Sequence, residues 1–154
     1  MNGLLAGMDP VLTTERLVWL LRGAGAAQLV LVAASPAIPI VLGWPAQVAV
    51  LPGLLRKIFW TYAAYILTSH LAFGLVTLLA PEWLLGSGGL GAAVCGFIMG
   101  WWGVRLGLHL VGFETRGIAD DGWKWWAKQA LGLLFVGLTS TYGLALWHHL
   151  GGAR

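Results

Sequence analysis

The chain has 154 residues, of which 58% are hydrophobic and only 10% are charged, and its mean hydropathy is +0.80. A soluble domain carries about 25% charged residues, so this composition excludes a water-soluble protein and predicts an integral membrane protein whose surface faces lipid. The net charge of +3 comes from scattered lysines and arginines with no run longer than Arg56-Lys57, which excludes a nucleic-acid partner and is typical of residues that flank membrane spans.

The N-terminal segment does not resemble a cleaved signal peptide. Asp9 and Glu15 precede its apolar stretch, and Arg16 and Arg22 interrupt it, whereas a signal peptide begins with positive charge. The letters TTER, residues 13–16, are typical of a helix start. Residues 11–22 are therefore predicted to form either a short interfacial helix or the first turns of the first span.

Four stretches are apolar enough to cross a bilayer core of roughly 30 Å as helices of about 20 residues. They are residues 23–44, 58–80, 90–112 and 127–149. Pro36 and Pro39 each lack a backbone donor, so a kink or an early end is predicted in the first stretch. The predicted fold class is all-α: one transmembrane domain over residues 1–154, an integral membrane four-helix bundle with a short N-terminal interfacial helix.

Basic residues and tryptophans gather at the predicted span ends. The first and third loops hold five basic residues against three on the opposite side, which predicts that both loops are cytoplasmic. Eight of the ten tryptophans also fall at span ends, where indole rings concentrate at headgroup depth. Only Trp101 and Trp102 lie deep in a span.

The third span carries a stripe of small residues. At 100° per residue its members fall within an arc of about 80°; they are Gly89, Ala92, Gly96, Gly100, Gly103 and Gly107. Because small residues let helix backbones approach closely in lipid, we expect the stripe to be a helix–helix contact surface. The partner could be another span of this chain or another subunit.

The opposite face of the third span carries Trp101, Arg105 and His109, four residues apart, with Trp102 at its edge. One interpretation is that Arg105 and His109 reach for lipid phosphates at the nearby membrane surface. The other is a site for an anionic or polar headgroup, with Arg105 as the donor fork and the two indoles as its apolar wall. Glu114 is a third, weaker candidate, as an ion-pair partner for Arg105.

The remaining polar residues give little support to a metal or cofactor site. His70 is the deepest titratable group; it is predicted to form an interhelical hydrogen bond or, less readily, to join the ligand site. The four histidines differ too much in depth for a bis-histidine haem, and the adjacent His148 and His149 diverge by about 100° on a helix. The single cysteine, Cys95, excludes an internal disulfide and is expected to be a packing residue. No cofactor and no metal are therefore predicted.

No set of residues indicates a reaction. The spans contain no deep Asp or Glu, which argues against a proton- or cation-coupled pump. The mid-span hydroxyls of Thr139, Ser140, Thr141 and Tyr142 have no neighbouring base, so a serine-type nucleophile is not predicted. We expect a non-catalytic protein.

One resemblance covers about the middle third of the chain. The order "LAPEWLL…GLGAAVCGFIMGWWGVRLGL" is a span end, a proline-bounded aromatic turn and a glycine-rich span bearing an arginine. It resembles small uncharacterised bacterial four-helix membrane proteins of the DoxX-like kind. Because those families lack an assigned biochemical role, the resemblance implies no catalytic residue; it does imply a multi-pass protein of the bacterial inner membrane.

Two functions follow from these residues. The first is an accessory or assembly subunit that packs through the glycine-rich third span, within a homo-oligomer or a larger membrane complex. The alternative is a lipid- or quinone-binding carrier with its polar headgroup site at Arg105 and His109. In both cases membrane lipids are the expected surroundings.

Overall fold

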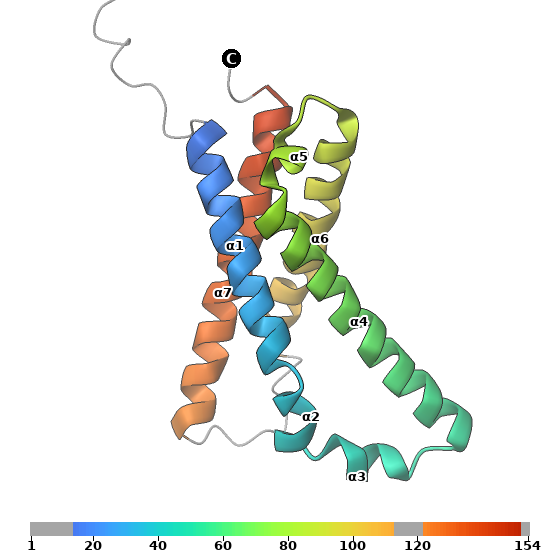
Figure 1. Cartoon of the computed structure of the whole chain (residues 1–154). Helices are drawn as coiled ribbons and strands as arrows, with labels where there is room; N and C mark the ends of the chain where they lie inside the picture. The colour runs from blue at the N-terminus through green and yellow to red at the C-terminus, as the bar shows by residue number, and fades with distance from the viewer. Residues whose placement is uncertain (1–13, 113–121, 152–154) are drawn as a thin grey trace, which may run out of the picture. The chain divides into compact units, whose positions relative to one another are not determined.

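The computed structural model of the chain describes residues 14–112 and 122–151. Within these residues the chain forms seven α-helices and no strand, which confirms the all-α prediction (Figure 1). The helices are α1 (Thr14–Ala34), α2 (Ala37–Val41), α3 (Trp44–Ala49), α4 (Gly53–Leu79), α5 (Pro81–Leu85), α6 (Gly89–Leu110) and α7 (Gly122–His149).

Four helices, α1, α4, α6 and α7, are long and apolar enough to cross a membrane, which confirms the integral membrane prediction. Helix α6 follows its predicted range closely, whereas α4 and α7 each begin five residues before theirs. The added residues, GLLRK in α4 and GWKWW in α7, include the basic and aromatic residues that the sequence analysis placed in loops. Lysine, arginine and leucine are good helix formers, so the helical hydrogen bonding continues past the apolar stretch.

The first apolar helix lies earlier in the chain than its predicted range. Residues 14–22 form the first turns of α1, which is continuous to Ala34. The helix stops where Pro36 and Pro39 follow, and the Ser35 hydroxyl donates a 2.7 Å hydrogen bond to the Leu31 carbonyl in its last turn. The chain then continues through the short helices α2 and α3, separated by Gly43 in the left-handed conformation (φ 63°).

The chain divides into two compact units. The second unit is Arg22–Ala80, and the first consists of the residues before and after it, so that one boundary falls within α1 and the other between α4 and α5. In the first unit α6 and α7 lie side by side, and α5 packs against both of them (Figure 1). In the second unit α3 packs against α4. There the rings of Trp44 and Phe59 meet edge to face, 5.3 Å apart.

Helices α6 and α7 pack along a seam whose buried residues are spaced alternately by three and four. They are Gly91, Cys95, Ile98 and Trp102 on α6 and Phe135, Leu138, Tyr142 and Ala145 on α7, and of these Gly91 and Cys95 also lie against Leu84 of α5. This spacing keeps one stripe of each helix against its neighbour, as in coiled coils. The helices run antiparallel: Gly96 lies by Leu146, Gly103 by Thr139, and Gly132 by His109. We call this contact the α6–α7 seam.

In the second unit, α1 and α4 approach at Gly25, at what we call the α1–α4 crossing. A Cβ atom on Gly25 would lie only 2.9 Å from both the Gly74 carbonyl oxygen and the Leu78 Cα atom. Gly74 meets the side chain of Leu29 in turn. The approach is therefore close enough that only glycine fits at residue 25 without a backbone shift.

Candidate functional site

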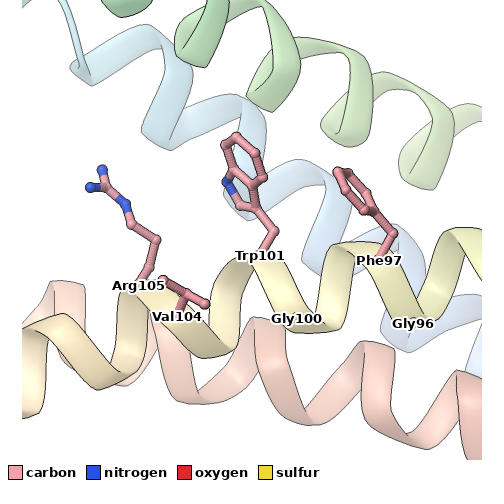
Figure 2. A pocket seen from close by; sticks show the side chains of 6 residues that line it. All are labelled: Gly96, Phe97, Gly100, Trp101, Val104 and Arg105. Atoms are coloured by element: carbon pink, nitrogen blue, oxygen red, sulfur yellow. The ribbon is translucent and has the colours of Figure 1, made fainter.

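A recess of about 470 Å³ lies on α6, lined by Gly96, Phe97, Gly100, Trp101, Val104 and Arg105. Figure 2 shows the side chains of Phe97, Trp101 and Arg105 projecting from one side of the helix, while α7 runs along the other side. The rings of Phe97 and Trp101 lie 6.1 Å apart and tilted by 44°. Gly96 and Gly100 contribute no side chain, so the helix backbone itself forms part of this surface. We call this feature the α6 recess.

Arg105 is the only charged residue in the lining of the α6 recess, and its side chain is half-buried. It stands five residues before Leu110, the last residue of α6, so its Cα lies roughly 8 Å from the helix end. In Figure 2 its guanidinium group lies at one end of the row that Phe97 and Trp101 continue. Such a planar fork can donate two parallel hydrogen bonds to a carboxylate or phosphate.

The structure separates the two mid-span tryptophans. Trp101 lines the α6 recess, but Trp102 is 0% exposed and its ring packs 5.6 Å from that of Phe135 in the α6–α7 seam. Adjacent residues on a helix point about 100° apart, and α7 lies on the Trp102 side. Trp102 is therefore a packing residue of the seam and not a wall of the recess.

His109 also lies on the α7 side. Its ring meets that of Phe135 edge to face at 5.8 Å, and a Cβ atom on Gly132 would come within 2.6 Å of its Nε2 atom. Gly132 thus leaves the space that the imidazole occupies. Of the three residues predicted to share one face, Trp101 and Arg105 meet in the recess and His109 does not join them.

The stripe of small residues divides between two environments. Gly96 and Gly103 face α7, where a Cβ atom would make ordinary contacts with Leu146 at 3.7 Å and Thr139 at 3.9 Å. Among the described residues, nothing lies within 4 Å of a Cβ position at Gly89, Gly100 or Gly107. Ala92 is half-buried. Two of the six stripe residues therefore contact α7, and three leave α6 open.

His70 belongs to the second unit, where it is 3% exposed on α4. It shares a face of α4 with Gly74 and Thr77, and Thr77 is fully buried. Across the α1–α4 crossing, the Cβ atom of Gln28 lies 3.4 Å from the Cβ position of Gly74, and Gln28 is also fully buried. Gln28 is not among the residues predicted from the sequence, although a lone amide within an apolar helix is a signal for such a buried polar contact.

The C-terminal histidines of α7 hold neighbouring elements of the first unit. The Nε2 atom of His149 donates a 2.6 Å hydrogen bond to the Leu84 carbonyl oxygen, to which the Cys95 thiol also donates at 3.6 Å. Leu84 lies near the end of α5, where helix carbonyls lack intrahelical partners. His148 Nε2 lies 3.3 Å from the Thr14 hydroxyl. The contacts to Leu84 hold α5 against α6 and α7. Among the described residues there is no cluster of three side chains that could bind a metal ion.

The hydroxyls inside the apolar helices bond locally where the structure shows their partners. Thr141 donates to the Gly137 carbonyl and Ser69 to the Tyr65 carbonyl, each at 2.8 Å and four residues back along its own helix. Glu114, the predicted ion-pair candidate for Arg105, lies outside the described residues. Neither α6 nor α7 contains an aspartate or a glutamate.

Comparisons with protein-family models, curated proteins and solved structures give no match to this chain. The resemblance to DoxX-like proteins therefore stays a prediction.

Proposed function

We propose that this membrane protein binds an amphipathic membrane molecule, a lipid or a quinone, in the α6 recess. The observation that carries the proposal is the half-buried Arg105 at one end of an apolar, aromatic-lined recess. Ligand sites are commonly apolar cavities of about 300–1,000 Å³ in which a few polar groups orient the ligand. A recess of about 470 Å³ falls in that range.

The order of residues along α6 fixes how such a molecule would lie. From Arg105 to Phe97 the helix axis advances by roughly 12 Å. A polar head that accepts hydrogen bonds or carries negative charge would meet Arg105 near the helix end. Its apolar body would follow Trp101 and Phe97 toward the middle of the span, parallel to the helix.

The electrostatics of an arginine within a span support the same assignment. An arginine costs about 2.5–3.5 kcal/mol at the centre of a transmembrane helix on insertion scales and less toward the helix end, where Arg105 stands. An anionic or hydrogen-bonding head at the guanidinium group lowers that free energy.

A second candidate function is an accessory subunit that packs against another chain through α6. The open space at Gly100 and Gly107 supports it, since helices associate in lipid where small residues allow close approach. The two candidates use different parts of the open face, because Gly100 lines the recess and Gly107 does not.

Native mass spectrometry of the protein extracted from its membrane in mild detergent tests both candidates. Binding predicts a lipid- or quinone-sized adduct that is lost in Gly100→Leu, which fills the recess, and in Arg105→Gln, but is retained in Gly107→Leu. The adduct mass, with the redox-sensitive ultraviolet absorbance of the extract, distinguishes a quinone from a lipid.

Other results of the same experiment would overturn the binding proposal. An adduct that persists in both Gly100→Leu and Arg105→Gln would exclude the recess as its site. Unrelated subunits that co-purify without an adduct, and that are lost in Gly107→Leu as well as in Gly100→Leu, would identify the protein as an accessory subunit.

A further inference from the structure

The basic residues of the first unit's helix pair are gathered at one end. Helix α6 contains Arg105 near its C-terminal end, and α7 contains Lys124 and Lys128 in its first two turns. The two helices have no acidic residue and no other lysine or arginine. Because they run antiparallel, all three cations lie toward the same end of the pair, and His148 and His149 lie at the other.

The two lysines stand on a part of α7 that extends past α6. His109, the second-last residue of α6, lies against Gly132, so residues 122–131 of α7 continue beyond the end of α6. These ten residues correspond to roughly 15 Å of helix. We call this segment the α7 overhang.

Lys124 and Lys128 continue the buried stripe of α7. The spacing of four and three that joins Phe135, Leu138 and Tyr142 in the α6–α7 seam leads back through Leu131 to these two lysines. Both side chains are half-buried and four residues apart, so they lie on the same side of the helix. Cations in the first turns of a helix oppose its macrodipole, so helix stability does not account for them.

Tryptophans mark the depth at which the overhang lies. Trp123, Trp125 and Trp126 are 62%, 42% and 69% exposed, and the rings of Trp125 and Trp126 meet edge to face at 4.6 Å. Exposed indole rings concentrate at the membrane–water interface, the level of the lipid phosphates. The three indoles are therefore expected to hold Lys124 and Lys128 near the level of the lipid phosphates.

We infer that the α7 overhang binds the headgroup of an anionic phospholipid through Lys124 and Lys128. The ammonium groups bind the phosphate, and the surrounding indoles hold the segment at headgroup depth. This site is distinct from the α6 recess and does not depend on it, since no residue of the overhang lines that recess. It also orients the helix pair, because its basic end meets the leaflet that is richer in anionic lipid.

The test is native mass spectrometry of the full-length protein titrated in detergent with phosphatidylglycerol or with phosphatidylcholine. The wild type should retain phosphatidylglycerol preferentially. Lys124→Gln/Lys128→Gln should weaken that retention roughly thirtyfold, from the contribution of two basic residues at an anionic surface. Lys124→Arg/Lys128→Arg keeps both charges and should retain the lipid.

A matched control separates binding at this site from nonspecific electrostatic attraction between anionic lipid and basic residues. Arg56→Gln/Lys57→Gln removes two charges from α4 and should leave the preference unchanged. Equal losses in the α4 variant would overturn the proposal, and so would equal retention of the two lipids by the wild type. Retention of phosphatidylglycerol that is unchanged in Lys124→Gln/Lys128→Gln would also overturn the proposal.

Discussion

The α6–α7 seam and the α1–α4 crossing both bring helices together through glycine, but the glycines face different atoms. At the crossing, Gly25 faces the backbone of α4, where a Cβ atom would lie 2.9 Å from the Gly74 carbonyl oxygen. In the seam, Gly96 and Gly103 face the side chains of Leu146 and Thr139 at ordinary contact distances. The shortest of these distances is at Gly25 on α1, whose Cβ position is 2.5 Å from the Leu78 nitrogen, although α1 has two glycines and α6 has six. On α6 the crowded glycine is Gly91, which lies outside the small-residue stripe and whose Cβ position is 2.8 Å from the Leu84 carbonyl oxygen of α5.

This difference shows that the number of glycines in a helix does not locate its tightest contact. A glycine excludes other residues only where a backbone or a fixed side chain occupies the space of its Cβ atom. On α6 the glycines at 100 and 107 meet nothing within 4 Å among the described residues, and they leave room instead. Substitutions at crowded and open positions should therefore separate packing from the proposed functions.

The largest effect is expected at Trp102, in the seam. Trp102→Ala removes a fully buried ring from its contact with Phe135 and should lower the free energy of unfolding by about 3–5 kcal/mol. Trp101→Ala, one residue away in the recess, should lower it by less than about 1 kcal/mol. Unfolding in detergent by added dodecyl sulfate measures both variants. Similar losses in the two would show that the indoles do not lie in different environments.

The next largest effect is expected at the α1–α4 crossing. Gly25→Ala places a methyl group against the backbone of Leu78 and should destabilise the protein by about 1–3 kcal/mol, since neither backbone can yield without moving its helix. Gly23→Ala is the matched control on the same helix, because nothing lies within 4 Å of its Cβ position. The same unfolding measurement applies, and a Gly25→Ala variant as stable as Gly23→Ala would contradict the close approach.

A smaller effect is expected at Gly132, where the neighbour is a side chain that can move. Gly132→Ala would displace the His109 ring, whose Nε2 atom lies 2.6 Å from the added methyl position, at a cost of about 1 kcal/mol or less, because the gain in helix propensity offsets part of the loss. His109→Ala should relieve the clash, so the double variant should be more stable than the sum of the single effects predicts. Additive free energies would show that the two residues do not touch.

Much of the fold could be predicted from sequence because it depends on local properties. Apolar length identifies the four long helices, and Pro36 and Pro39 account for the end of α1 at Ala34. The early starts of α4 and α7 could not be predicted from hydropathy, because basic and aromatic residues lower the mean hydropathy and therefore suggest a loop. The same residues also suit a helix at the membrane surface.

The candidate site could be predicted only in part, because its details depend on which helix lies opposite. The sequence indicates that Arg105 and Trp101 share a side of α6, and the structure places both in the recess. It does not indicate that α7 covers Trp102 and His109, since Phe135 and Gly132 are distant in the chain. For the same reason the sequence could not show which residues of the small-residue stripe contact α7 and which remain open.

The smallest effect is expected at Gly107, and it bears on function more than on stability. Gly107→Ala adds a methyl group in open space and should raise the free energy of unfolding by about 0.5–1 kcal/mol, because alanine is the better helix former. If the open face of α6 serves only the recess, the variant should be slightly more stable and retain any bound adduct. If another chain packs there, the same methyl group should weaken the association while the isolated chain gains stability. Unfolding in detergent and size-exclusion chromatography on the same sample measure the two quantities, and opposite changes in them would favour the accessory-subunit function over the recess.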